Sequence, residues 1–198
     1  HAAQWFPAIE KLATERKWKL VSITKSSCPA VIMKTKRNGA ADKACATWQI
    51  EIAKKIAQDR PAKVFMSGFT NYQYPRVNSS EKYESSWSDG LAKFIAMAKV
   101  KPNQLVYIED TPTPKKNSPA CISRDPEACD FGWSYGGATA STESLINRIG
   151  ATYISVRKVL CPVQCSAVYA GKNVYRDSTH ISVGTALRLT DEISSAVS

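Results

Sequence analysis

The sequence is poor in histidine and lacks any long apolar run. Only two of the 198 residues are histidine, His1 and His180, so few side chains can act as a general base near neutral pH. No apolar stretch approaches the ~20 residues of a membrane-spanning helix, and no signal peptide is recognisable. The length is ordinary for one domain. We therefore expect residues 1–198 to form a single domain, excised from a longer protein.

The chain also lacks a concentrated basic segment, although its formal net charge is +10. Clustered lysine and arginine side chains would neutralise the phosphates of a nucleic acid. Here the basic residues are scattered, no basic run exceeds two residues, and no nucleic-acid-binding motif is present. We expect no nucleic-acid partner, and a basic surface that faces solvent or an anionic glycan or lipid.

The six cysteines lack the spacing of a metal site. No Cys-x-x-Cys pattern occurs and the two histidines are not spaced as zinc ligands, so we expect disulfides and no metal. Six cysteines can pair in many ways, and the sequence leaves the choice open. The simplest choice joins nearest neighbours, as Cys28–Cys45, Cys121–Cys129 and Cys161–Cys165. Disulfides indicate an oxidising, extracytoplasmic compartment.

Short apolar runs alternate with amphipathic segments along the chain. Helical spacing predicts helices over residues 7–16, 83–98, 141–149 and 182–194, and one that contains Trp48, Ile52 and Ile56 and ends before Pro61. Apolar runs predict strands over residues 18–24, 64–66, 105–108 and 152–156. This alternation indicates an α/β fold with a parallel sheet covered on both faces, a three-layer αβα sandwich.

Polar residues follow several of these elements. Gly68 and Asp110 come after predicted strands, and a loop with Asp177 and His180 precedes the last predicted helix. Ligands of open parallel sheets bind at the carboxyl ends of the strands. We therefore expect these residues to converge on one edge of the sheet.

A long irregular stretch, residues 110–138, follows the third predicted strand. Loops of this length are usually functional or lid-like. Its aromatic residues Trp133 and Tyr135 could stack on a sugar or pack in the core, and the sequence leaves this open.

Two segments resemble a known family. Residues 1–7 read His-Ala-Ala-Gln-Trp-Phe-Pro, and residues 175–182 carry the Asp177–His180 pair. They are similar to the SGNH (GDSL-type) hydrolases, above all to the SGNH domain fused to bacterial membrane acyltransferases. The resemblance implies the SGNH hydrolase fold with a flavodoxin-like parallel sheet. It also implies an inner first strand that ends in Gly-Asp-Ser immediately before His1, with that serine as the nucleophile.

The resemblance assigns roles to residues of this chain. His180 would be the general base and Asp177 would orient it, although an Asp-x-x-His pair alone can be no more than a loop hydrogen bond. Gly68 matches the glycine that supplies an oxyanion donor in the family, and Asn71, in the loop after Gly68, could substitute for the family's asparagine. The family's asparagine after the next core strand is missing, because Glu-Asp-Thr-Pro follows Ile108.

The same resemblance implies an extracytoplasmic O-acyltransferase domain. A membrane acyltransferase domain of the same polypeptide would deliver an acyl group, most simply acetyl. This domain would pass it through an acyl-serine to a hydroxyl of a cell-surface glycan or glycolipid, with no cofactor. We expect Asp110 and Arg176 to contact the substrate. An esterase of the same fold and a non-catalytic glycan-binding module are the alternatives.

Overall fold

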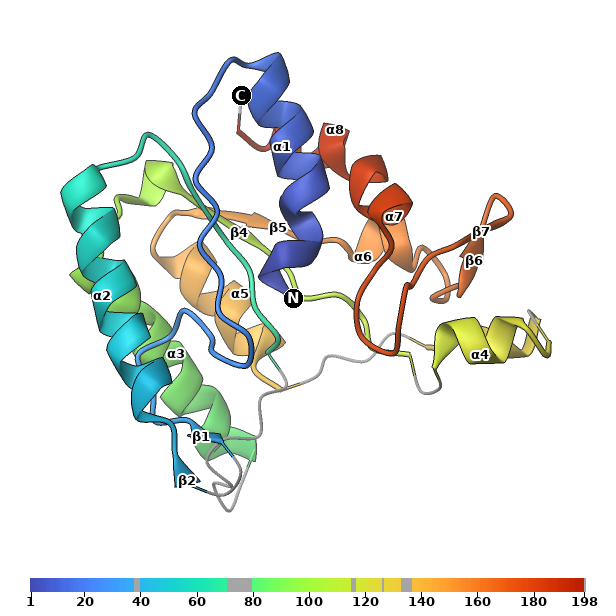
Figure 1. The fold of residues 1–198 in the computed structure, drawn as a ribbon, viewed down its shortest axis with the longest axis horizontal. Helices are drawn as coiled ribbons and strands as arrows, with labels where there is room; N and C mark the ends of the chain where they lie inside the picture. Colours follow the sequence, from blue (N-terminus) through green and yellow to red (C-terminus); the bar gives the residue numbers. More distant parts are fainter. Residues whose placement is uncertain (38–39, 71–79, 115–116, 126, 133–136, 198) are drawn as a thin grey trace. The chain divides into compact units, whose positions relative to one another are not determined.

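The structure is a computed structural model of the 198-residue chain. It describes residues 1–37, 40–70, 80–114, 117–125, 127–132 and 137–197 (Figure 1). Asn71, Trp133 and Tyr135 lie outside the described residues. Two compact units are present: unit 1 comprises His1–Ser22, Asp110–Ser134 and Ile154–Ser198, and unit 2 comprises Ile23–Glu109 and Tyr135–Tyr153.

The main sheet has three strands in the order β3-β4-β5. They are β3 (Val64–Met66), β4 (Leu105–Ile108) and β5 (Thr152–Ile154). β3 and β4 run parallel, with Val64 opposite Leu105. All four residues of β4 are buried, as a strand covered on both faces requires. The three strands were predicted, although β5 ends two residues earlier than expected.

Three helices of unit 2 were also predicted. They are α2 (Lys43–Asp59), α3 (Ser80–Met97) and α5 (Thr139–Arg148). Figure 1 shows α3 between the other two, and it contacts both. Trp87, Leu91 and Phe94 recur on one face of α3 and are fully buried in the core. The apolar periodicity of this segment therefore marks the face that packs.

The loop before α2 is fixed to that helix. Cys28 and Cys45 form a disulfide with a Cα–Cα distance of 5.5 Å. Asp42 caps the helix by accepting a hydrogen bond from the Cys45 amide. A short antiparallel pair, β1 (Lys36–Arg37) and β2 (Ala40–Ala41), precedes this cap, and the 3₁₀ turn η2 (Pro102–Gln104) precedes β4.

Unit 1 begins with a 3₁₀ turn, η1 (Ala2–Trp5), that leads into α1 (Phe6–Glu15). Helix α1 contacts α7 (Val183–Arg188) and α8 (Thr190–Ser195), as Figure 1 shows. The predicted last helix was wrong in one respect, because it is two short helices that meet at Leu189. Its predicted N-cap is confirmed, since Ser182 accepts a hydrogen bond from the Thr185 amide.

The remaining elements of unit 1 are short. They are α4 (Ser118–Ile122), η3 (Glu127–Cys129), α6 (Arg157–Leu160) and the antiparallel pair β6 (Val168–Tyr169) and β7 (Lys172–Asn173). The stretch after Asp110, expected to be irregular, therefore contains two helical turns. Among the described residues, no helix has the length and apolar character needed to span a membrane.

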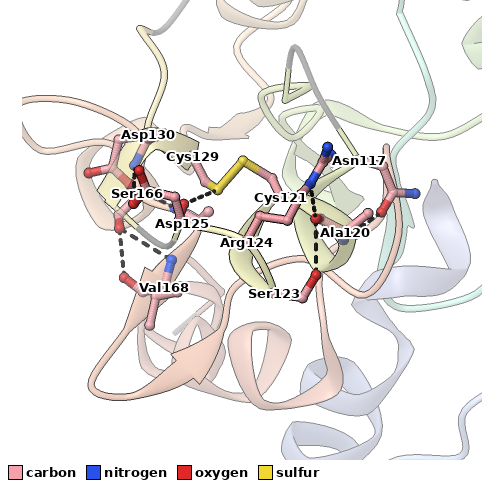
Figure 2. Close-up of a disulfide and its surroundings, with 12 residues drawn as sticks. Asn117, Ala120, Cys121, Ser123, Arg124, Asp125, Cys129, Asp130, Ser166 and Val168 are labelled. Atoms are coloured by element: carbon pink, nitrogen blue, oxygen red, sulfur yellow. Dashed lines mark hydrogen bonds between the residues drawn. A yellow bond between two sulfur atoms is a disulfide. The ribbon is translucent and has the colours of Figure 1, made fainter.

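Two disulfides stabilise this part of unit 1. Figure 2 shows Cys121–Cys129, and Cys161–Cys165 is the second. Asp130 joins them, because its carboxylate accepts hydrogen bonds from the Gln164 side chain (2.8 Å) and the Ala167 amide (3.1 Å). The three nearest-neighbour pairs predicted from the sequence are therefore confirmed.

The predicted strand over residues 18–24 is wrong. These residues form no regular element, and the Val21 side chain is 58% exposed. An apolar run becomes a strand only where a neighbouring strand supplies hydrogen bonds. No strand of the described chain pairs with this segment.

Candidate active site

The loop that carries His180 is closed by its own backbone and by Asp177. Tyr175 and Ile181 face each other as an antiparallel bridge, and the Arg176 amide donates to the His180 carbonyl (2.9 Å). Within the loop, Asp177 Oδ1 accepts hydrogen bonds from the His180 amide (2.8 Å) and the Thr179 amide (2.9 Å). One carboxylate therefore holds the backbone that presents the imidazole.

The same carboxylate holds the imidazole itself. His180 Nδ1 lies 2.9 Å from Asp177 Oδ2 and 3.0 Å from Oδ1. Because an ionised carboxylate only accepts hydrogen bonds, Nδ1 carries the proton in the neutral ring and Nε2 is left as the basic nitrogen. The His180 side chain is 30% exposed, so the ring can be reached from solvent.

The environment of Asp177 favours its ionised form. Burial alone would raise its pKa, but hydrogen bonds from the Thr179 and His180 amides and from the His180 ring hold the pKa well below the usual value. Asp177 is therefore negatively charged at neutral pH. A stable carboxylate is what an orienting partner of a general base needs.

Arg176 and Thr179 complete the surroundings of this pair. Arg176 Nε lies 3.4 Å from Asp177 Oδ2, with an exposed side chain. Thr179 Oγ1 lies 3.2 Å from His180 Nδ1. The predicted contact of Arg176 with substrate stays a prediction, and Thr179 was not singled out from the sequence.

A second imidazole lies against the first. His1 Nδ1 is 2.8 Å from Asp110 Oδ1, and the two side chains are 8% and 6% exposed. The ring centroids of His1 and His180 are 4.7 Å apart, with a tilt of 44°. The structure therefore brings Asp110 and the Asp177 loop together, as predicted, and places His1 between them.

Asp110 is buried beside His1, with a side chain that is 6% exposed. Its Oδ1 accepts hydrogen bonds from His1 and from the Thr111 amide (2.9 Å). The predicted contact of Asp110 with substrate stays a prediction. No residue pattern pointed to the His1–Asp110 pair, because its members are 109 positions apart.

The other predicted residues belong to unit 2. Gly68 follows β3, as expected. Among the residues that the structure describes, a Cβ atom at Gly68 would meet Trp87 (3.9 Å) and the Tyr107 hydroxyl (4.0 Å), which is ordinary contact. Packing against these described neighbours therefore does not demand a glycine there. Asn71 lies outside the described residues, so the oxyanion roles of both residues stay predictions.

The hydrogen bonds of the His180 ring go to Asp177 and Thr179, and in the described part of the chain none reaches a serine. The arrangement is a carboxylate–imidazole pair whose Nε2 receives no hydrogen bond from the described residues. Such a pair can take a proton from a hydroxyl and return it to a leaving group.

Comparisons with known proteins agree with the resemblance of residues 1–7 and 175–182. The family model described as the SGNH domain fused to AT3 domains matches residues 1–195. A solved structure, the periplasmic domain of a lipopolysaccharide acetyltransferase from Salmonella serovar Paratyphi A, is similar with a TM-score of 0.70 and 15% sequence identity. The match covers 98% of this chain and 78% of that chain. A search of the curated proteins finds no match.

Proposed function

Because this chain belongs to the family of SGNH domains fused to AT3 domains, we propose that it is an extracytoplasmic O-acyltransferase domain. It moves an acyl group, most simply acetyl, to a hydroxyl of a cell-surface glycan or glycolipid. The acyl donor comes from the membrane acyltransferase domain of the same polypeptide. The three disulfides support a place outside the cytoplasm.

The Asp177–His180 pair is the observation that carries this proposal. His180 Nε2 takes the proton of the serine hydroxyl as the serine oxygen attacks the acyl carbonyl carbon. The imidazolium, stabilised by Asp177, returns this proton to the leaving group and an acyl-serine remains. His180 then takes the proton of the acceptor hydroxyl, whose oxygen attacks the acyl-serine. The proton finally returns to the released serine oxygen.

We place the nucleophilic serine immediately before His1, in one SGNH domain that includes residues 1–198. The His1 ring lies 4.7 Å from the His180 ring, and consecutive Cα atoms are only about 3.8 Å apart. A serine at that position is therefore within reach of the base. The family places a strand immediately before this serine. Residues 18–24 are an apolar run that pairs with no described strand, and the upstream strand would give this run a neighbour in the sheet.

By the resemblance to the family, the serine amide and the Gly68 amide would bind the oxyanion of each tetrahedral intermediate, with Asn71 in place of the family's asparagine. Preorganised donors of this kind are usually the largest single contribution to acyl-transfer catalysis. Arg176 is a candidate for holding an anionic group of the glycan, because its side chain is 62% exposed.

The test uses a protein that includes the upstream residues, with p-nitrophenyl acetate as donor. Replacing His180 by Ala is expected to lower kcat by roughly a thousandfold or more, the scale for losing a triad member. Lys172→Ala on the exposed strand β7 is the control and should leave kcat unchanged. A turnover that survives the loss of His180 would refute the mechanism.

Hydrolysis is the second candidate, and the exposure of His180 favours it. At 30% exposure, water can approach the ring, so the acyl-serine can be attacked by water as well as by a sugar. Measuring acetylated acceptor against free acetate, with and without added glycan, separates the two. Failure of a serine-directed phosphonate to label the protein would instead favour a glycan-binding module.

A further inference from the structure

Gln4 is a buried polar residue whose side chain joins two distant segments. It is 7% exposed and lies on η1, one turn after His1. Its Oε1 accepts a hydrogen bond from the Ile181 amide (3.1 Å), and its Nε2 donates to Thr111 Oγ1 (3.4 Å). The first segment is 177 positions away and the second 107.

The hydrogen bond from the Ile181 amide to Gln4 holds the backbone next to His180, the proposed base. Ile181 follows His180 and is 2% exposed, so its amide cannot turn to solvent for a partner. Leaving a buried backbone amide without an acceptor is unfavourable, because the amide has lost its hydrogen bonds to water as well. The Gln4 oxygen therefore fixes the point at which the His180 loop leaves the Tyr175–Ile181 bridge.

His1 makes the parallel connection three residues earlier. It binds Asp110, the neighbour of Thr111, and its ring packs on His180, the neighbour of Ile181. The side chains of His1, the N-cap residue of η1, and of Gln4, within η1, thus hold the same two segments at successive residues. The start of helix α1 is in this way tied to the loop that carries the base.

We propose that Gln4 is a positioning residue for His180, acting through the Ile181 amide to set the distance between the imidazole and the start of η1. The functional part of this inference rests on the proposed mechanism, in which the nucleophilic serine immediately precedes His1, the N-cap residue of η1. Misplacing a reacting group by about 1 Å can cost about a hundredfold in rate. Gln4 touches neither serine nor substrate in this scheme.

Gln49 offers a matched control. It is a buried glutamine, 2% exposed, on helix α2. Its Oε1 accepts from the Met33 amide and its Nε2 donates to the Pro29 carbonyl, both at 3.3 Å. Gln49 therefore also holds a loop, but one that belongs to unit 2 and does not carry the candidate base.

The first measurement needs no activity. In protein with labelled histidine rings, the only two histidines give two NMR signals. The wild type should show cross-relaxation between the rings. Gln4→Leu should displace the His180 signal and weaken this cross-relaxation, whereas Gln49→Leu should change neither. Thr111→Val keeps the shape of the side chain and removes the hydrogen bond from Gln4 Nε2. This variant should displace the His180 signal less than Gln4→Leu does. If Gln4→Leu does not fold, an unmoved His180 signal in Thr111→Val overturns the proposal.

The second measurement is the split between kcat and KM for p-nitrophenyl acetate. Gln4→Leu should lower kcat about a hundredfold with little change in KM, and Gln49→Leu should retain the wild-type kcat. If the His180 signal moves but the wild type is inactive, the positioning role holds and the proposed function fails. If the wild type is active and Gln4→Leu changes neither its kcat nor its His180 signal, the positioning role is refuted.

Discussion

Gly90 is the position where one added methyl group should destabilise the chain most clearly. It is buried within helix α3, and its carbonyl accepts a hydrogen bond from the Ile32 amide (3.0 Å). A Cβ atom there would lie 2.6 Å from the Ile32 carbonyl oxygen and 2.8 Å from Val31 Cγ1. The first neighbour is backbone and cannot turn aside, so Gly90→Ala must push the loop away from the helix.

The net effect can be estimated from opposing terms. Alanine in place of glycine favours a helix by about 1 kcal/mol. Overpacking typically costs about 1–3 kcal/mol, and weakening the Ile32–Gly90 hydrogen bond adds about 1 kcal/mol. We therefore expect Gly90→Ala to lower the free energy of unfolding by about 1–3 kcal/mol.

Urea unfolding, followed by circular dichroism, measures this difference. Gly184 is the control, because it is an exposed residue of helix α7 and a Cβ atom there would meet no described residue within 4 Å. Gly184→Ala should stabilise the protein by up to about 1 kcal/mol. If Gly90→Ala is as stable as the wild type, or more so, the close approach of loop and helix is refuted.

Two further predictions concern pH and disulfides. The pKa of Asp177 is lowered in the folded state. Its ionised form therefore adds stability that is present above the unfolded pKa of about 3.9 and is lost as the pH falls through the lower folded pKa. The difference in unfolding free energy between wild type and Asp177→Asn should therefore shrink as the pH is lowered below about 4. Removing the Cys28–Cys45 disulfide should lower the free energy of unfolding by about 3 kcal/mol, and removing Cys161–Cys165 should lower it by about 2 kcal/mol. The difference arises because the two disulfides close loops of 17 and 4 residues. Equal losses in urea unfolding would contradict this dependence on loop length.

The elements that sequence periodicity predicted are those with packing partners in the described chain. Helix α3 shows its buried face in the spacing of Trp87, Leu91 and Phe94, and strand β4 is a short apolar run buried on both sides. Residues 18–24 have a similar apolar character but form no strand. A strand depends on its neighbour in the sheet, and the composition of one segment does not contain that neighbour.

The candidate site shows the same limit. Asp177 and His180 were found from the sequence because one loop contains both. The His1–Asp110 and Gln4–Ile181 contacts join residues 109 and 177 positions apart. No local pattern encodes such pairs, and only the folded topology brings them together. Thr179 was missed for a different reason, because a threonine beside a histidine is too common to indicate a site.

The contacts of residues 1–7 show which part of the proposed function the family resemblance in this segment concerns. His1 binds Asp110 and packs on His180, Gln4 binds the Ile181 amide, Trp5 is fully buried, and Pro7 lies in the first turn of α1, where proline is well tolerated. The side chains of His1, Gln4 and Trp5 are all less than a tenth exposed, so they are not accessible for binding a glycan from solvent. They serve the assembly of the base and the nucleophile that we propose. Similarity in this segment therefore bears on the proposed reaction, and we expect exposed residues to determine which acceptor is used.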